Sequence, residues 1–89
     1  MTPLGDPRRH YWLIKGMARA TGTDVVHAFG EGRLDNADWA AMVRDCRRCG
    51  WAENCADWLA RGGAACVAPA PCRNRRRLAV LRVEEELAQ

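Results

Sequence analysis

Apolar residues recur every three or four positions along most of this 89-residue chain, a spacing that predicts helices. β-Branched and aromatic residues alternate nowhere over a useful length, so we expect no sheet. The clearest stripe follows the helical spacing i, i+3, i+4 and i+7. Its members are Trp39, Met42, Val43 and Cys46. The pattern predicts an all-α fold, a compact bundle of four to five short helices.

Helix start and stop signals divide the first part of the chain. Asp6-Pro7 opens a helix that runs to about Ala20, because proline suits the first helical position. Thr23 is the expected N-cap of a short second helix that Gly30 ends. The apolar residues of these two helices include Trp12, Leu13, Met17, Val25, Val26 and Phe29.

The second part of the chain predicts up to three more helices. Asp35 or Asn36 caps the helix that carries the stripe and ends near Gly50. A further helix covers about residues 52–61, and residues 62–71 form a loop because they hold two glycines and two prolines. Pro71 is the expected first residue of the last helix. The inner faces of these last two helices carry Cys55, Trp58, Leu59, Cys72, Ala79, Val80, Val83 and Leu87.

The length fits a single small helical metal-binding domain over residues 1–89. A chain this short buries a modest core, so a metal would stabilise it noticeably. The first ten residues lack the apolar segment of a signal peptide, and the run from Tyr11 to Ile14 is too short to span a membrane. We therefore expect a cytoplasmic protein with no membrane partner. In that reducing environment, closely spaced cysteines more often bind metal than form structural disulfides.

Four of the five cysteines lie on or beside the predicted inward faces. Cys46, Cys49 and Cys55 have Cys-x2-Cys-x5-Cys spacing, and Cys72 follows a Pro-x-Pro stretch. The short gap keeps two sulfurs on one side of a turn, and the longer gap lets the next helix present a third. One buried cysteine alone would be an ordinary core residue, but together they predict a metal centre. Cys66 lies in the loop and is an incidental thiol, a redox thiol or an alternative fourth ligand.

The spacing bears on which metal the thiolates hold. Structural zinc usually takes two closely spaced pairs of ligands, and this chain has one pair followed by two single cysteines. A [4Fe-4S] cubane needs four thiolates around a larger object and accepts single ligands from separate helices. We therefore expect a [4Fe-4S] cluster, with zinc as the alternative cofactor.

The run Cys46-x2-Cys49-x5-Cys55-x2-Trp58 resembles the ligand run of the WhiB-like iron–sulfur regulators. It is also similar to the end of the iron–sulfur loop in helix-hairpin-helix DNA glycosylases. Both resemblances imply a [4Fe-4S] cluster. In both families the fourth cysteine precedes the run, whereas here it follows, so their DNA activities are not carried over to this chain.

Over about residues 17–81 the chain resembles a family of small bacterial domains of unknown function. The resemblance rests on Gly32-Arg-Leu34, the three-cysteine run with Trp58-Leu59, and a Pro-x-x-Cys-x-Asn element, here Pro69 to Asn74. It supports Cys72 over Cys66 as the fourth ligand and implies no established activity.

Arginines and tryptophans flank the cysteines, although the net charge is only +3. Guanidinium groups would offset the negative charge of a tetrathiolate cluster, and the indoles would shield it from water. The residues expected around the ligands are Arg47, Arg48, Trp51, Trp58, Arg73 and Arg76. The last helix begins with arginines and ends with Glu84-Glu85-Glu86, opposite to what the helix dipole favours. An anionic centre, a nucleic-acid or acidic partner, or a solvated face with local ion pairs would explain that order.

The sequence shows no catalytic triad, phosphate loop or paired acids, so we expect no enzyme. His10 and His27 lie far from the cysteines in sequence and are minor ligand candidates. The first hypothesis is a small [4Fe-4S] protein with a redox, sensing or regulatory role exerted through a protein partner. The alternatives are a zinc-stapled interaction module and a metal-free helical domain whose basic last helix binds nucleic acid.

Overall fold

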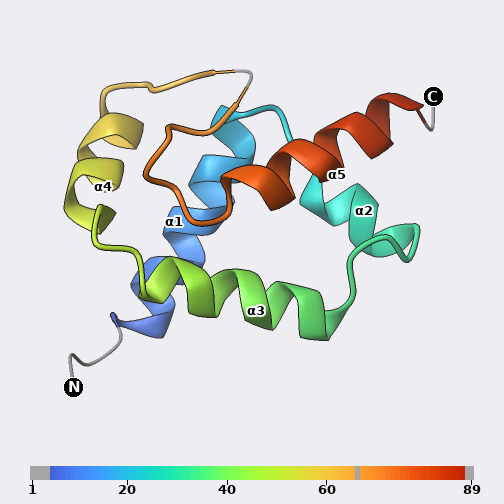
Figure 1. Ribbon diagram of the computed structural model, residues 1–89, viewed down its shortest axis with the longest axis horizontal. Coiled ribbons are helices and arrows are strands. Elements are labelled where there is room, and N and C mark those ends of the chain that lie inside the picture. The colour runs from blue at the N-terminus through green and yellow to red at the C-terminus, as the bar shows by residue number, and fades with distance from the viewer. Residues whose placement is uncertain (1–4, 66, 88–89) are drawn as a thin grey trace.

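The computed structural model describes residues 5–65 and 67–87, and within them the chain forms five helices and no strand (Figure 1). The helices are α1 (Pro7–Ala20), α2 (Val25–Gly30), α3 (Asn36–Arg47), α4 (Ala52–Ala60) and α5 (Arg75–Leu87). The predicted all-α fold is confirmed.

Two helices begin at the caps that the sequence predicts. At the start of α1 the Asp6 carboxylate accepts a hydrogen bond from the Arg8 amide at 2.9 Å, with Pro7 in the first turn. At the start of α3, Asp35 accepts from the Asp38 amide at 2.8 Å, and the Asp38 carboxylate accepts from the Asp35 amide at 3.1 Å. This reciprocal capping box fixes where the cysteine-bearing helix begins.

The predicted N-cap of α2 was wrong. Asp24 caps this helix by accepting from the His27 amide at 2.9 Å. Thr23 is buried instead, with its hydroxyl 2.9 Å from that of Thr21 and donating to the Leu78 carbonyl at 3.4 Å. The Thr23 hydroxyl therefore ties the turn after α1 to α5, and the next polar residue serves as the cap.

The helices pack in two groups around one core. α1 packs against α3 and α4, and α2 packs against α5. In Figure 1, α4 lies at one end of the long axis, α2 lies toward the other, and α1 crosses between α4 and α5. A Cβ atom on Gly16 would lie 3.1 Å from the Leu59 Cδ1 atom, so the bare glycine lets α1 and α4 approach closely. The largest apolar core residues are Leu13, Ile14, Met17, Leu34, Met42, Leu78 and Leu81.

The prediction for the last helix was wrong at its start and in its buried face. α5 begins at Arg75, because the chain from Pro69 onward forms turns in which the Cys72 amide donates to the Pro69 carbonyl at 2.9 Å. Leu78 and Leu81 face the core from α5. The predicted face carried Val80, Val83 and Leu87, which are 50%, 52% and 80% exposed. Cys72 thus lies in a turn before the helix.

Candidate metal centre

The four predicted ligands come from three separate segments. Cys46 lies in the last turn of α3, and Cys49 follows in the turn after it, where its amide donates to the Cys46 carbonyl at 3.0 Å. Cys55 lies in α4 and is buried. Cys72 lies in the turn before α5. The Cys49 thiol donates toward the carbonyl oxygen of Pro71, the residue before Cys72, at 3.7 Å.

These four cysteines line one cavity. The lining residues are Leu13, Ile14, Met17, Cys46, Cys49, Trp51, Ala52, Cys55, Cys72, Arg73 and Asn74. The cavity has more space than one water molecule needs, and α1 closes it with three apolar side chains. The sulfurs are spread around it: among the residues described, no three of them lie within 4.8 Å of one another. The thiols are brought together around a shared space and not gathered at a point.

The surroundings favour the neutral form of the Cys46 and Cys55 thiols. Burial and, to a lesser extent, the thiols of Cys55, Cys49 and Cys72 together raise the pKa of Cys46 to about 12. Burial likewise raises the pKa of Cys55 to about 11, with contributions from Cys72 and Cys49. An ionised neighbouring sulfur therefore disfavours ionisation of the Cys46 and Cys55 thiols, and a bound cation would offset this effect.

Two backbone amides form hydrogen bonds with the Cys72 thiol. Burial raises the pKa of its thiol, while hydrogen bonds from the Asn74 and Arg75 amides act in the opposite direction. Asn74 is 1% exposed, and its amide nitrogen donates to the Met42 carbonyl at 2.8 Å, which fixes the turn against α3. The side-chain oxygen of Asn74 has no hydrogen-bond partner among the described residues, although it borders the cavity.

The sequence interpretation missed the role of His10. This residue is 3% exposed, and its Nδ1 atom lies 3.4 Å from the Cys46 sulfur. The Cys46 thiol also contacts the His10 carbonyl oxygen at 3.5 Å. Burial lowers the pKa of His10, so its imidazole is neutral at physiological pH. The available signal was its helical spacing from Leu13, Ile14 and Met17, which places it on the face that borders the cavity.

Of the six residues expected around the ligands, two line the cavity: Trp51 and Arg73. Arg47 donates to the Gly5 carbonyl at 2.7 Å instead. Arg48 is exposed, and Arg76 lies on a surface hollow with Arg73. The remaining tryptophan, Trp58, packs against the core.

Trp12, one of the apolar residues of the first predicted helix, is 66% exposed and does not join the core. Its position on α1 faces away from Leu13, Ile14 and Met17, which occupy the buried stripe. Cys66 lies outside the described residues.

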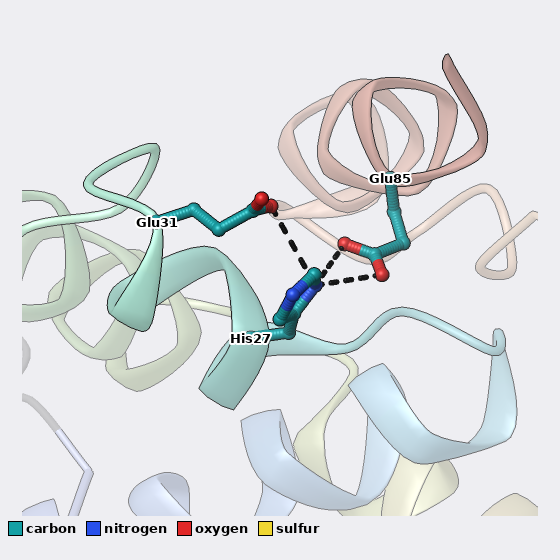
Figure 2. Close-up of side chains that lie close together, drawn as sticks. All are labelled: His27, Glu31 and Glu85. Carbon is teal, nitrogen blue, oxygen red and sulfur yellow. Dashed lines mark hydrogen bonds and ion pairs between the residues drawn. The ribbon is translucent and has the colours of Figure 1, made fainter. Parts of the chain in front are cut away.

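A second cluster of ionisable side chains joins α2 to α5 (Figure 2). The His27 Nδ1 atom lies 2.7 Å from both carboxylate oxygens of Glu85 and 3.6 Å from Glu31. In residues 5–65 and 67–87 these three side chains are the one group of metal-type ligands whose atoms all lie within 4.8 Å of one another.

The charges of this cluster are already paired. The Arg33 guanidinium contacts Glu31 at 2.6 Å and Glu85 at 2.5 Å. The hydrogen bond to Glu85 raises the pKa of His27, and the same bond lowers the pKa of Glu85. We name these four residues the ion-pair network; it explains how the acidic end of α5 is stabilised despite the helix dipole.

Comparison with known proteins gives a family and no more. No helix in the described ranges is both long and apolar enough to cross a membrane. No curated protein and no solved structure matches the chain. The sequence matches a family of unknown function, DUF6455, over residues 1–84, a longer stretch than the resemblance over residues 17–81 had suggested. The chain belongs to the DUF6455 family.

Proposed function

We propose that this protein binds a [4Fe-4S] cluster through Cys46, Cys49, Cys55 and Cys72. The observation that carries the proposal is that these four cysteines, from three separate segments, line the same cavity. The cluster would serve a redox, sensing or regulatory role in the bacterial cytoplasm, exerted through a protein partner.

The chemistry of the donors and their spread support this choice. Thiolates are soft ligands that suit zinc and iron–sulfur clusters alike, so geometry must distinguish the two. Tetrahedral zinc with Zn–S bonds of about 2.3 Å brings its ligand sulfurs to about 3.8 Å from one another. No three of the described sulfurs lie within 4.8 Å of one another, which favours the larger object. A cubane, when bound, supplies one-electron chemistry.

The residues around the cysteines have roles of their own in such a site. Leu13, Ile14 and Met17 of α1 exclude water from the cavity. Arg73 borders it and would offset negative charge on the ligated sulfurs. Trp51, which precedes α4, covers the space between the second and third ligands.

The test is anaerobic purification of the full chain, followed by visible spectroscopy and analysis for iron, zinc and acid-labile sulfide. A brown protein with about four iron and four sulfide ions per chain is expected for a cubane. Colourless protein with one zinc would replace the proposal with the zinc-stapled interaction module. Folded protein that takes up neither metal on anaerobic reconstitution would refute both metal functions, leaving the basic surface around Arg73 and Arg76 as the remaining candidate site.

The ligand assignment has its own test, in which each cysteine is replaced singly by serine. We expect the cluster to be lost in Cys46→Ser, Cys49→Ser, Cys55→Ser and Cys72→Ser, and kept in Cys66→Ser. The last variant is the matched control, since it removes a thiol that lies outside the proposed set. Loss of the cluster in Cys66→Ser, together with its retention in Cys72→Ser, would show that Cys66 and not Cys72 is the fourth ligand.

A further inference from the structure

His10 is a non-cysteine residue whose side chain makes a polar contact with a proposed ligand. It lies in α1, 3% exposed, on the face that also carries Leu13 and Met17. Its Nδ1 atom is 3.4 Å from the Cys46 sulfur, a separation that suits an N–H···S hydrogen bond.

The ring is held in this position by the residues that precede α1. A Cβ atom on Gly5 would lie 2.0 Å from the His10 Nε2 atom, so the glycine backbone packs directly on the ring. Gly5 is itself fixed to the end of α3, because its amide donates to the Arg47 carbonyl at 3.2 Å. The Arg47 guanidinium donates back to the Gly5 carbonyl at 2.7 Å. These two hydrogen bonds thus tie the segment that packs on the His10 ring to the end of α3, which carries Cys46.

We propose that His10 is a positioning residue of the metal centre, whose Nδ1–H group donates a hydrogen bond to the ligated sulfur of Cys46. This inference rests on the proposed function of the four cysteines. The bond fixes the direction of the sulfur and stabilises its negative charge. Donors to cluster sulfurs favour the more negative, reduced state, so the bond raises the reduction potential.

The experiment compares three variants of the anaerobically prepared full chain. His10→Phe removes the donor and retains a ring, while His10→Asn retains an N–H donor close to the position of Nδ1. His27→Phe is the control, because it makes the same substitution at a histidine that does not line the cavity. For each protein we measure iron content, the reduction potential by anaerobic titration, and the rate of iron loss to a chelator.

We expect His10→Phe to bind the cluster with a lower reduction potential and with metal retention weaker by about 10- to 100-fold. His10→Asn should recover part of both quantities, and His27→Phe should keep the wild-type potential. An unchanged potential in His10→Phe would overturn the positioning role while leaving the ligand assignment intact. Complete loss of metal in both His10 variants, with normal folding by circular dichroism, would make His10 a ligand and refute the proposal.

A second variant covers the case in which His10→Phe does not fold. Gly5→Ala keeps the imidazole but forces it away from Cys46, because the added Cβ overlaps the ring. We expect a lower potential in this variant too, and an unchanged potential would count against the proposal. Wild-type protein that takes up no metal would refute the proposed function, and the positioning role with it, so the two failures are distinguishable.

Discussion

The cysteine cavity and the ion-pair network both gather metal-type ligands, but they do so in opposite ways. The cavity is enclosed by apolar side chains of α1, and its thiols are spread apart. The network lies at the surface between α2 and α5, and its ligand atoms are closer together (Figure 2). Distance alone would therefore favour the network as the metal site.

The difference in charge reverses that ranking. In the network, the Arg33 guanidinium already contacts both carboxylates, so a metal ion would have to displace a cation that is in place. In the cavity, burial raises the pKa of Cys46 and Cys55, and the neighbouring thiols act in the same direction, so a bound cation would stabilise their thiolates. A missing positive charge is thus a better sign of a metal site than a short distance between ligands.

The largest expected effect separates the two regions directly. Cys55→Ser should abolish metal binding and lower the free energy of unfolding by about 4 kcal/mol, the stabilisation that a ligand supplies at 1,000 times its Kd. Glu85→Gln, its counterpart in the network, should keep the full metal content. Metal analysis and urea unfolding of both variants would check this prediction. Equal metal loss in the two variants would contradict the claim that the cavity, and not the network, holds the metal.

The next effect concerns the turn that carries Cys72. Asn74→Ala should destabilise the protein by about 1–3 kcal/mol, because it removes a buried hydrogen bond to the Met42 carbonyl. Asn54→Ala, the same change at an exposed position of α4, should have almost no effect. Chemical denaturation gives both values. Similar values for the two variants would show that the Asn74 amide does not anchor the turn.

The cap of α3, which belongs to neither region, gives a reference for the size of these stability effects. Asp35→Ala should cost about 1 kcal/mol of unfolding free energy, because the capping box at the start of α3 loses its acceptor. Asp57→Ala, at an exposed position within α4, is the matched control and should be close to neutral. A loss as large as that of Cys55→Ser would mean that α3 depends on its cap more than on the metal.

The smallest effect is a pH dependence in the network. The pKa of His27 is raised above 6.5 in the folded state, so its contribution is complete below pH 6.5 and is lost as the pH rises through the folded value. Glu85 is the main cause, with Glu31 and Asp24 acting in the same direction. We expect wild-type protein to exceed Glu85→Gln in stability at pH 6 by more than at pH 8, with a difference below that of Asp35→Ala.

Urea midpoints across this pH range measure that prediction. His27→Gln serves as the control and should lack the same pH dependence. If the gap between wild type and Glu85→Gln stayed constant from pH 6 to 8, the His27–Glu85 contact would not be formed in solution.

The parts of the fold that depend on local chemistry were predictable. The capping residues Asp6 and Asp35 and the stripe of α3 gave the correct helices, because caps and apolar spacing act within one element. The start of α5 was not predictable from Pro71, because the chain there is held by turns and by the contact between Asn74 and Met42. A buried face also depends on the partner helix, which explains the error for Val80 and Val83.

The candidate site also combines contacts that local spacing predicts with contacts that depend on long-range packing. The spacing of Cys46, Cys49 and Cys55 was enough to predict that they approach one another, since the end of α3, the turn after it and the first part of α4 carry all three. The approach of Cys72 is a long-range property that spacing alone does not define. His10 lies 36 residues before Cys46, so its contact depends on how α1 packs across α3.

Trp51 gives the molecule an internal optical reporter. Its indole borders the cavity, whereas Trp12 is largely solvent-exposed on α1. An iron–sulfur cluster absorbs across the ultraviolet and visible range and would take up the excitation energy of a neighbouring indole, whereas zinc, with its filled d shell, would leave the emission bright. The fluorescence lost on replacing Trp51 with phenylalanine would therefore distinguish the two metals in intact protein, without removing either from its site.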